Sequence, residues 1–123
     1  MLKLIGVLLL SGHVGVAIDA SGGYAERTFS CTEAGVEQLF EFVLSALGPG
    51  EPAIQFVVGP IERQPECEVF FAALAENGIG NAVVSAQEIE AFANSHRMSP
   101  SSARTVAETF KEKHAKLFSK KRT

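Results

Sequence analysis

The spacing of apolar residues changes from a period of two to a period of about 3.6 near Thr32, and this change limits what the chain can fold into. Before Thr32, three short apolar or alternating segments at 3–10, 13–19 and 24–30 are separated by glycine-containing turns. The first segment is apolar almost throughout, as expected of a strand that is buried on both faces. The first quarter of the chain is therefore predicted to be a three-stranded antiparallel meander.

Helical periodicity begins at Thr32, which is a candidate N-cap residue. The predicted helix ends at Gly48-Pro49-Gly50, because glycine and proline stop a helix there. Its apolar stripe is expected to face the core and consists of Val36, Leu39, Phe40, Val43, Leu44 and Leu47.

The remainder of the chain alternates between strands and helices. Residues 53–58 and 81–85 are apolar segments of strand length, and residues 65–77 between them carry a helical apolar stripe. Ser85 begins a further helix, and Ser99 is the expected N-cap of the last one. The predicted fold class is α/β, with a mixed sheet of an antiparallel meander plus two parallel strands, covered by helices.

The composition is that of a single globular domain. The 123 residues are 46% hydrophobic and 20% charged, which is sufficient for a buried core. Cys31 and Cys67 fit neither a redox motif nor a metal site, so we expect unpaired thiols in a reducing, cytoplasmic compartment. The apolar run after Lys3 has the order of a signal peptide, which stays an alternative, but it is short for one and cannot cross a bilayer. We expect a buried strand there and no membrane partner.

The charges are distributed unevenly. Residues 1–95 contain three basic and twelve acidic residues (net −9), whereas residues 96–123 contain eight basic and two acidic residues (net +6). The chain is predicted to comprise a domain over residues 1–110 and a basic carboxy-terminal helix and tail over residues 96–123, packed on that domain or extending from it. Such an end is typical of proteins that bind nucleic acid (DNA or RNA), a membrane surface or an acidic partner, although a solvated helix has the same composition. The candidate binding residues are Arg97, Arg104, Lys111, Lys113, Lys116, Lys120, Lys121 and Arg122.

The sequence offers no pattern for a cofactor or a metal ion. His13, His96 and His114 lie on different predicted elements, without acids or cysteines at ligand spacing. No glycine-rich segment is followed by Lys-Ser or Lys-Thr, which excludes a phosphate-binding P-loop. We therefore expect no cofactor and no metal site.

Several short segments follow one another between Leu4 and Phe110 in a characteristic order. They are Leu4-Ile5-Gly6-Val7 with Ser11-Gly12-His13-Val14, Glu26-Arg27-Thr28-Phe29, Thr32-Glu33-Ala34-Gly35-Val36, residues 72–79, and residues 82–87 with Ala91-Phe92-Ala93. In this order they resemble the amino-terminal RuvC-like domain of DEDD-type insertion-sequence transposases, the group that includes the Piv DNA invertase. The resemblance implies an RNase H-like fold.

The chemistry that this resemblance implies requires four carboxylates, which hold two divalent metal ions beside a phosphodiester. The corresponding positions here are Leu8 on the first strand, Gly59 at the end of the fourth, and Ser99 and Ser102 on the last helix. Leucine, glycine and serine cannot hold Mg²⁺ against water. The chain is therefore predicted to be a pseudoenzyme with no nuclease or transposase activity.

Three functional hypotheses follow. The leading one is a non-catalytic, transposase-derived domain that binds nucleic acid or acts as a regulatory protein. The first alternative is a protein-interaction module that binds a partner or a second copy through a sheet edge or an apolar helix stripe, without a nucleic-acid role. The second alternative is a metal-dependent nuclease with a relocated acidic site, for which Asp19, Glu26 and Glu62 are the candidates.

Overall fold

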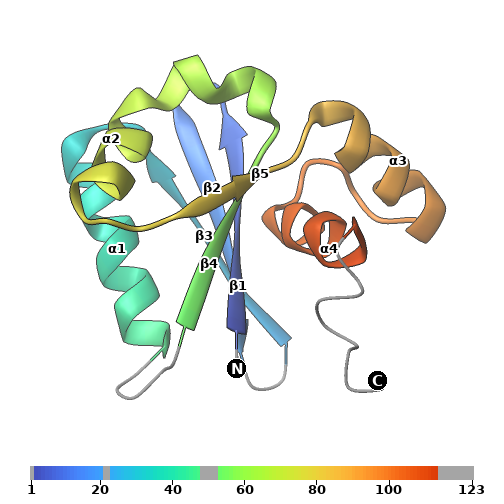
Figure 1. Cartoon of the computed structure of the whole chain (residues 1–123), viewed down its shortest axis with the longest axis horizontal. Helices are drawn as coiled ribbons and strands as arrows, with labels where there is room; N and C mark the ends of the chain where they lie inside the picture. Colours follow the sequence, from blue (N-terminus) through green and yellow to red (C-terminus); the bar gives the residue numbers. More distant parts are fainter. Residues whose placement is uncertain (1, 21–22, 48–52, 114–123) are drawn as a thin grey trace.

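The computed structural model describes residues 2–20, 23–47 and 53–113, which form a five-stranded mixed sheet with helices on both faces (Figure 1). The strands are β1 (Leu2–Leu10), β2 (His13–Ala20), β3 (Gly23–Ser30), β4 (Ala53–Gly59) and β5 (Asn81–Val83). Their order across the sheet is β3-β2-β1-β4-β5, in which only β2 runs antiparallel to its neighbours. This arrangement confirms the predicted α/β, RNase H-like fold class.

The helices form two layers, one on each face of the sheet (Figure 1). One layer contains α1 (Glu33–Leu47), the 3₁₀ helix η1 (Ile61–Cys67) and α2 (Glu68–Glu76), and the other contains α3 (Ala86–His96) and α4 (Ala103–Lys113). None of the helices in the described ranges is both long and apolar enough to span a bilayer.

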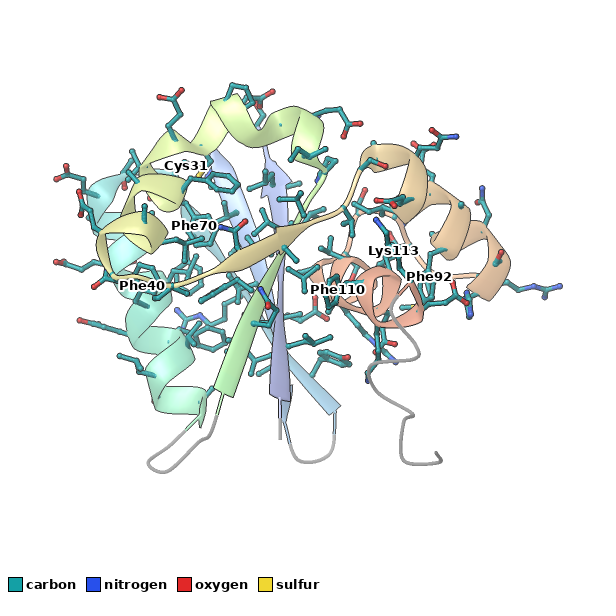
Figure 2. All side chains as sticks on the ribbon, viewed as in Figure 1. Cys31, Phe40, Phe70, Phe92, Phe110 and Lys113 are labelled. Carbon is teal, nitrogen blue, oxygen red and sulfur yellow. A yellow bond between two sulfur atoms is a disulfide. The ribbon has the colours of Figure 1, made fainter. Side chains whose placement is uncertain are left out.

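Each face of the sheet has its own core, because successive side chains of a strand point to opposite faces. Ile5 and Val7 of β1 lie in the core under α1 and α2, together with Phe56 of β4 and Phe70 of α2. Leu8 lies in the second core, under α3 and α4. Figure 2 shows Phe40 and Phe70 on the first side of the sheet and Phe92 and Phe110 on the second. The central strand β1 is thus buried on both faces, as its apolar sequence predicts.

Helix α4 lies directly against β1. A Cβ atom at Gly6 would collide with the carbonyl oxygen of Ala103 and would lie 3.0 Å from the Cβ of Ala107. Glycine on the strand and alanines on the helix therefore permit a backbone-to-backbone contact that larger side chains would prevent. This contact fixes the position of α4, and with it the start of the basic carboxy-terminal end.

Two predicted features of the first helix have different outcomes. Thr32 is the predicted cap, since its Oγ1 accepts a hydrogen bond from the backbone N of Gly35 at 3.0 Å. Leu44, however, is 69% exposed, so its predicted place in the core stripe is wrong. Val43, at 2% exposure, continues the stripe at that turn, and the neighbouring Phe42 packs against the core. The contacting face of the helix therefore includes Phe42 and Val43 and excludes Leu44.

The last helix begins later than predicted. Ser99 and Ser102 each accept a hydrogen bond from the backbone N two residues ahead, at 3.1 and 3.2 Å. These local bonds hold residues 99–102 in turns, which compete with helix formation. Ser99 is therefore not the N-cap of α4, which begins only at Ala103.

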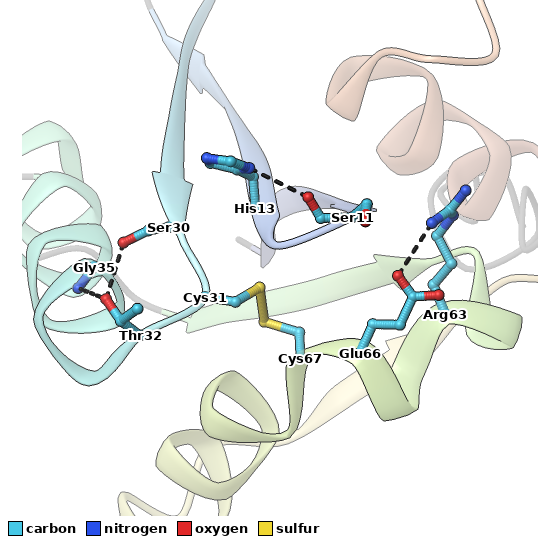
Figure 3. The surroundings of a disulfide bond; sticks show 9 residues. All are labelled: Ser11, His13, Ser30, Cys31, Thr32, Gly35, Arg63, Glu66 and Cys67. Carbon is cyan, nitrogen blue, oxygen red and sulfur yellow. Dashed lines mark hydrogen bonds and ion pairs between the residues drawn. A yellow bond between two sulfur atoms is a disulfide. The ribbon is translucent and has the colours of Figure 1, made fainter.

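The expectation of two unpaired thiols is wrong. Cys31 and Cys67 form a disulfide across 36 positions of sequence, with their Cα atoms 5.6 Å apart (Figure 3). Cys31 lies two residues before α1, and Cys67 lies directly before α2. The bond therefore ties together the amino-terminal ends of the two helices on one face. Disulfides persist mainly in oxidising compartments, so this bond weighs against the predicted cytoplasmic location.

Candidate functional site

The family resemblance assigns catalytic carboxylates to four positions, namely Leu8, Gly59, Ser99 and Ser102. Leu8 and Gly59 are register partners at the ends of the parallel strands β1 and β4, and Leu8 is also paired with Gly15 of β2. Paired residues of neighbouring strands point to the same face. Two of the four positions are therefore adjacent on the face that α3 and α4 cover.

The space in front of Gly59 is filled by apolar side chains. A Cβ atom built on Gly59 would lie 2.7 Å from Cγ2 of Val84 and 2.9 Å from Cδ1 of Ile89. Val84 is held there by backbone hydrogen bonds to Val58 and Ile61, at 3.0 and 2.9 Å. A larger side chain at this position therefore requires Val84 and Ile89 to shift.

Leu8 is buried in the same apolar cluster, at 6% exposure, with Val84, Ile89 and Ala103 among its members. The side chain of Leu8 thus contributes to the hydrophobic core on the face that α3 and α4 cover.

The two serines are placed differently with respect to Leu8. Ser102 and its neighbour Ser101 line a cavity of about 210 Å³ together with Leu8, Glu26 and Thr28. Ser99 does not line this cavity, and its carbonyl oxygen accepts the hydroxyl of Thr105 at 2.6 Å. Leu8, Gly59 and Ser102 therefore meet at one end of the sheet, whereas Ser99 lies in the preceding turn.

Of the acids proposed for a relocated site, the two whose side chains are described, Glu26 and Glu62, have different surroundings. Glu62 accepts a hydrogen bond from the backbone N of Ala86 at 2.9 Å, and it thereby stabilises the start of α3. Glu26 is exposed on the edge strand β3 beside the cavity of Ser102. The side chain of Asp19 lies outside the described residues. In the described ranges no three His, Cys, Asp or Glu side chains are grouped as metal ligands.

The basic candidates that can be placed lie on α3 and α4. Arg97 is exposed and is the C-cap residue of α3, with a left-handed backbone conformation. Arg104 and Lys111 are exposed on α4. They are seven positions apart and therefore lie on one side of the helix. The guanidinium of Arg104 lies 5.0 Å from the centre of the Tyr24 ring. Within the part of the chain that the structure describes, Arg97, Arg104 and Lys111 are in no ion pair. Lys116, Lys120, Lys121 and Arg122 lie outside the described residues.

Lys113 has a structural partner. Its Nζ lies 2.7 Å from Oε2 of Glu88 on α3. The other carboxylate oxygen of Glu88, Oε1, accepts a hydrogen bond from the backbone N of Ser85 at 2.9 Å, as part of a capping box. The hydrogen bond from Lys113, followed by that from the Ser85 backbone, lowers the pKa of Glu88 below its ordinary value. His96 and Glu112 form a second link between the same helices, at 3.4 Å. Lys113 therefore joins α3 to α4, and its predicted role in binding a partner stays untested.

A further concave surface lies between α1 and α2, and sequence reasoning did not identify it. It is a groove of about 370 Å³, lined by Glu33, Val36, Glu37, Phe40, Val69, Ala72, Ala73, Glu76 and Asn77. The sequence signal that accompanies it is the absence of Lys and Arg between Arg27 and Arg63 and between Arg63 and Arg97. Which glutamates meet at one groove depends on how the two helices pack.

Among the comparisons with known proteins, the one with solved structures gives a match. The chain is similar to the Thermus thermophilus RuvC structure, with 13% sequence identity and a TM-score of 0.48, over 89% of this chain and 77% of that chain. No family model and no curated protein matches the chain. The assignment of the fold rests on the strand order and register described above.

Proposed function

We propose that this chain is a non-catalytic RNase H-like domain, descended from a transposase RuvC-like domain, that binds nucleic acid through its basic carboxy-terminal end. The observation that carries the non-catalytic part is the packing around Gly59. Val84 and Ile89 occupy the space that a carboxylate would need there, and Leu8 belongs to the same apolar cluster.

The nucleic-acid part is supported by the charges on α3 and α4. Arg97, Arg104 and Lys111 are exposed and are not neutralised by carboxylates of the described residues. They precede four further basic residues in the sequence from Lys116 to Arg122. Lys and Arg side chains that meet phosphates release counterions, so binding of this kind weakens steeply with salt.

The test is a titration of labelled duplex and branched DNA with the full chain at several salt concentrations. We expect binding at low salt and a linear fall of log K with log salt. Replacing three basic residues at the end should reduce the slope by roughly 2–3 and weaken binding at least tenfold. This variant is Lys120→Ala/Lys121→Ala/Arg122→Ala. Absence of binding at low salt would contradict the proposal.

Two controls make the result specific. Arg63→Ala removes an exposed basic residue that, unlike Arg97, Arg104 and Lys111, is paired with a carboxylate of the described residues, that of Glu66 at 3.1 Å, and it should leave DNA binding unchanged. Incubation of the DNA with the chain and Mg²⁺ or Mn²⁺ should give no cleavage. Cleavage that disappears in Glu62→Gln would instead favour the nuclease with a relocated acidic site.

A further inference from the structure

The groove between α1 and α2 has an apolar floor and an acidic rim. Val36, Phe40 and Val69 contribute apolar surface to its lining, and Glu33, Glu37 and Glu76 contribute carboxylates. Its volume of about 370 Å³ lies at the lower end of the range of about 300–1,000 Å³ that is typical of ligand pockets. The groove is therefore large enough for a few side chains of a partner.

The floor of the groove is held in place by the core beneath it. The ring of Phe40 lies 6.4 Å from the ring of Phe70 and 6.3 Å from that of Phe56, both of which are fully buried. The Cys31–Cys67 disulfide connects the segments from which α1 and α2 start. Helices joined in this way keep the groove formed in the absence of a partner, which lowers the cost of binding.

The charge around the groove has one sign. Helices α1 and α2 carry five glutamates and no lysine or arginine. Within the part of the chain that the structure describes, Glu33, Glu37 and Glu76 are in no ion pair. A complementary occupant needs basic groups for the rim and apolar groups for the floor.

The chain itself contains a segment of this chemistry. Residues 116–122 place Leu117 and Phe118 among four basic residues, namely Lys116, Lys120, Lys121 and Arg122. We infer that the α1–α2 groove binds this segment of a second copy of the chain. The contact joins two different surfaces and is therefore heterologous, so that each copy can offer both a groove and a basic segment.

A second copy is a better source than the same copy because of the fold. The groove lies in the α1–α2 layer, whereas α4 ends at Lys113 in the layer on the opposite face of the sheet (Figure 1). A segment that follows Lys113 would have to pass around an edge of the sheet to reach the groove of its own copy. This inference goes beyond nucleic-acid binding and does not require it.

The test is sedimentation velocity of the full chain over a range of concentrations at low and high salt. The wild-type chain should associate at low salt, and association should weaken as salt screens the charges. The groove variant is Glu33→Gln/Glu37→Gln/Glu76→Gln, and the segment variant is Lys116→Gln/Lys120→Gln/Lys121→Gln/Arg122→Gln. Each should self-associate at least tenfold more weakly than the wild type.

Mixing the two variants separates a specific contact from a general effect of charge. The groove variant retains an intact basic segment and the segment variant retains an intact groove, so an equimolar mixture should form one-to-one heterodimers. A wild-type chain that stays monomeric at every concentration, or a mixture that does not associate, would overturn the inference.

A matched control addresses the loss of three negative charges. Glu41 on α1, Glu68 on α2 and Glu90 on α3 are exposed and do not line the groove. Changing these three to glutamine alters the net charge as much as the groove variant does and should leave self-association unchanged. An equal loss in this control would contradict the groove as the binding site.

A peptide measurement identifies the occupant directly. A fluorescent peptide of residues 111–123 should bind the segment variant, and its affinity should fall at least tenfold when the groove glutamates of that variant are also changed. Replacing Leu117 and Phe118 of the peptide by serine should also weaken binding at least tenfold, because the apolar floor then has no partner. A peptide that binds both proteins equally well would overturn the inference, whatever the DNA titration shows.

Discussion

Leu8 and Gly59 are neighbours across β1 and β4, and the space in front of Gly59 is filled by Val84 from beyond β5. Apolar side chains thus occupy the position that the family resemblance assigns to a glutamate. On the proposal made above, restoring the carboxylate alone would not restore a site.

Gly59→Ala is therefore expected to destabilise the fold by about 1–3 kcal/mol, because the added methyl group overpacks the contact with Val84 and Ile89. Gly15→Ala is the matched control on the other side of Leu8, since a Cβ there lies 3.9 Å from the nearest atom, Cβ of Leu8. Urea unfolding of the two variants should separate them. Equal stabilities would show that the space at Gly59 is not closed.

The Glu88–Lys113 link predicts a stability that depends on pH. Because the pKa of Glu88 is lowered in the folded state, the contribution of the pair is fully present above the unfolded-state pKa of about 4.5 and is lost as the pH falls through the lower folded-state value. Urea unfolding at several pH values from about 3 to about 7 should show this loss in the wild type. The loss of stability should be smaller in Lys113→Ala, which has no cation to pair with Glu88.

Two substitutions of Glu88 separate its two roles. Glu88→Gln retains an oxygen for the capping box but loses the charge, so its cost at neutral pH should stay below about 1 kcal/mol, as for other exposed ion pairs. Glu88→Ala also removes the hydrogen bond from the Ser85 backbone N, whereas the bond from the backbone N of residue 88 to Oγ of Ser85 stays, so this variant should cost up to about 1 kcal/mol more. If the two variants are equally stable, the hydrogen bond between Ser85 and the side chain of residue 88 contributes nothing measurable.

The Cys31–Cys67 disulfide closes a loop of 36 positions. Reduction, or the double change Cys31→Ser/Cys67→Ser, should destabilise the fold by roughly 3–4 kcal/mol, mainly because the unfolded chain gains freedom. Thermal unfolding with and without reductant measures this effect, and the double variant should not respond to reductant. Two titratable thiols in the native chain, purified without reductant, would contradict the bond.

Much of the fold follows from local sequence. The alternation of apolar residues places β1, β2 and β3, and the side chain of Thr32 fixes the start of α1, because these signals act between near neighbours. The start of α4 was wrongly predicted, since Ser99 and Ser102 capture backbone N–H groups in turns. Local propensity alone does not show whether a helix that starts at Ser99 or turns over residues 99–102 are more stable.

The sites depend on distances that a sequence does not contain. Cys31 and Cys67 could be paired only once their Cα atoms were known to lie 5.6 Å apart. Glu37 and Glu76 line one groove only because of the way that α1 and α2 pack. The family resemblance implies that Leu8 and Gly59 lie close together. That Val84 and Ile89 occupy the space beside them depends on how the segment after β5 and helix α3 pack against the sheet.

The contact between Gly6 and Ala103 also has a mechanical consequence. Helix α4 rests with its backbone on the central strand, and the basic segment continues from that helix. A force on the segment is therefore transmitted to the middle of the sheet, where β1 is hydrogen-bonded to β2 on one side and to β4 on the other. Such a force acts on the most buried strand and not on an edge strand, which is hydrogen-bonded on one side only.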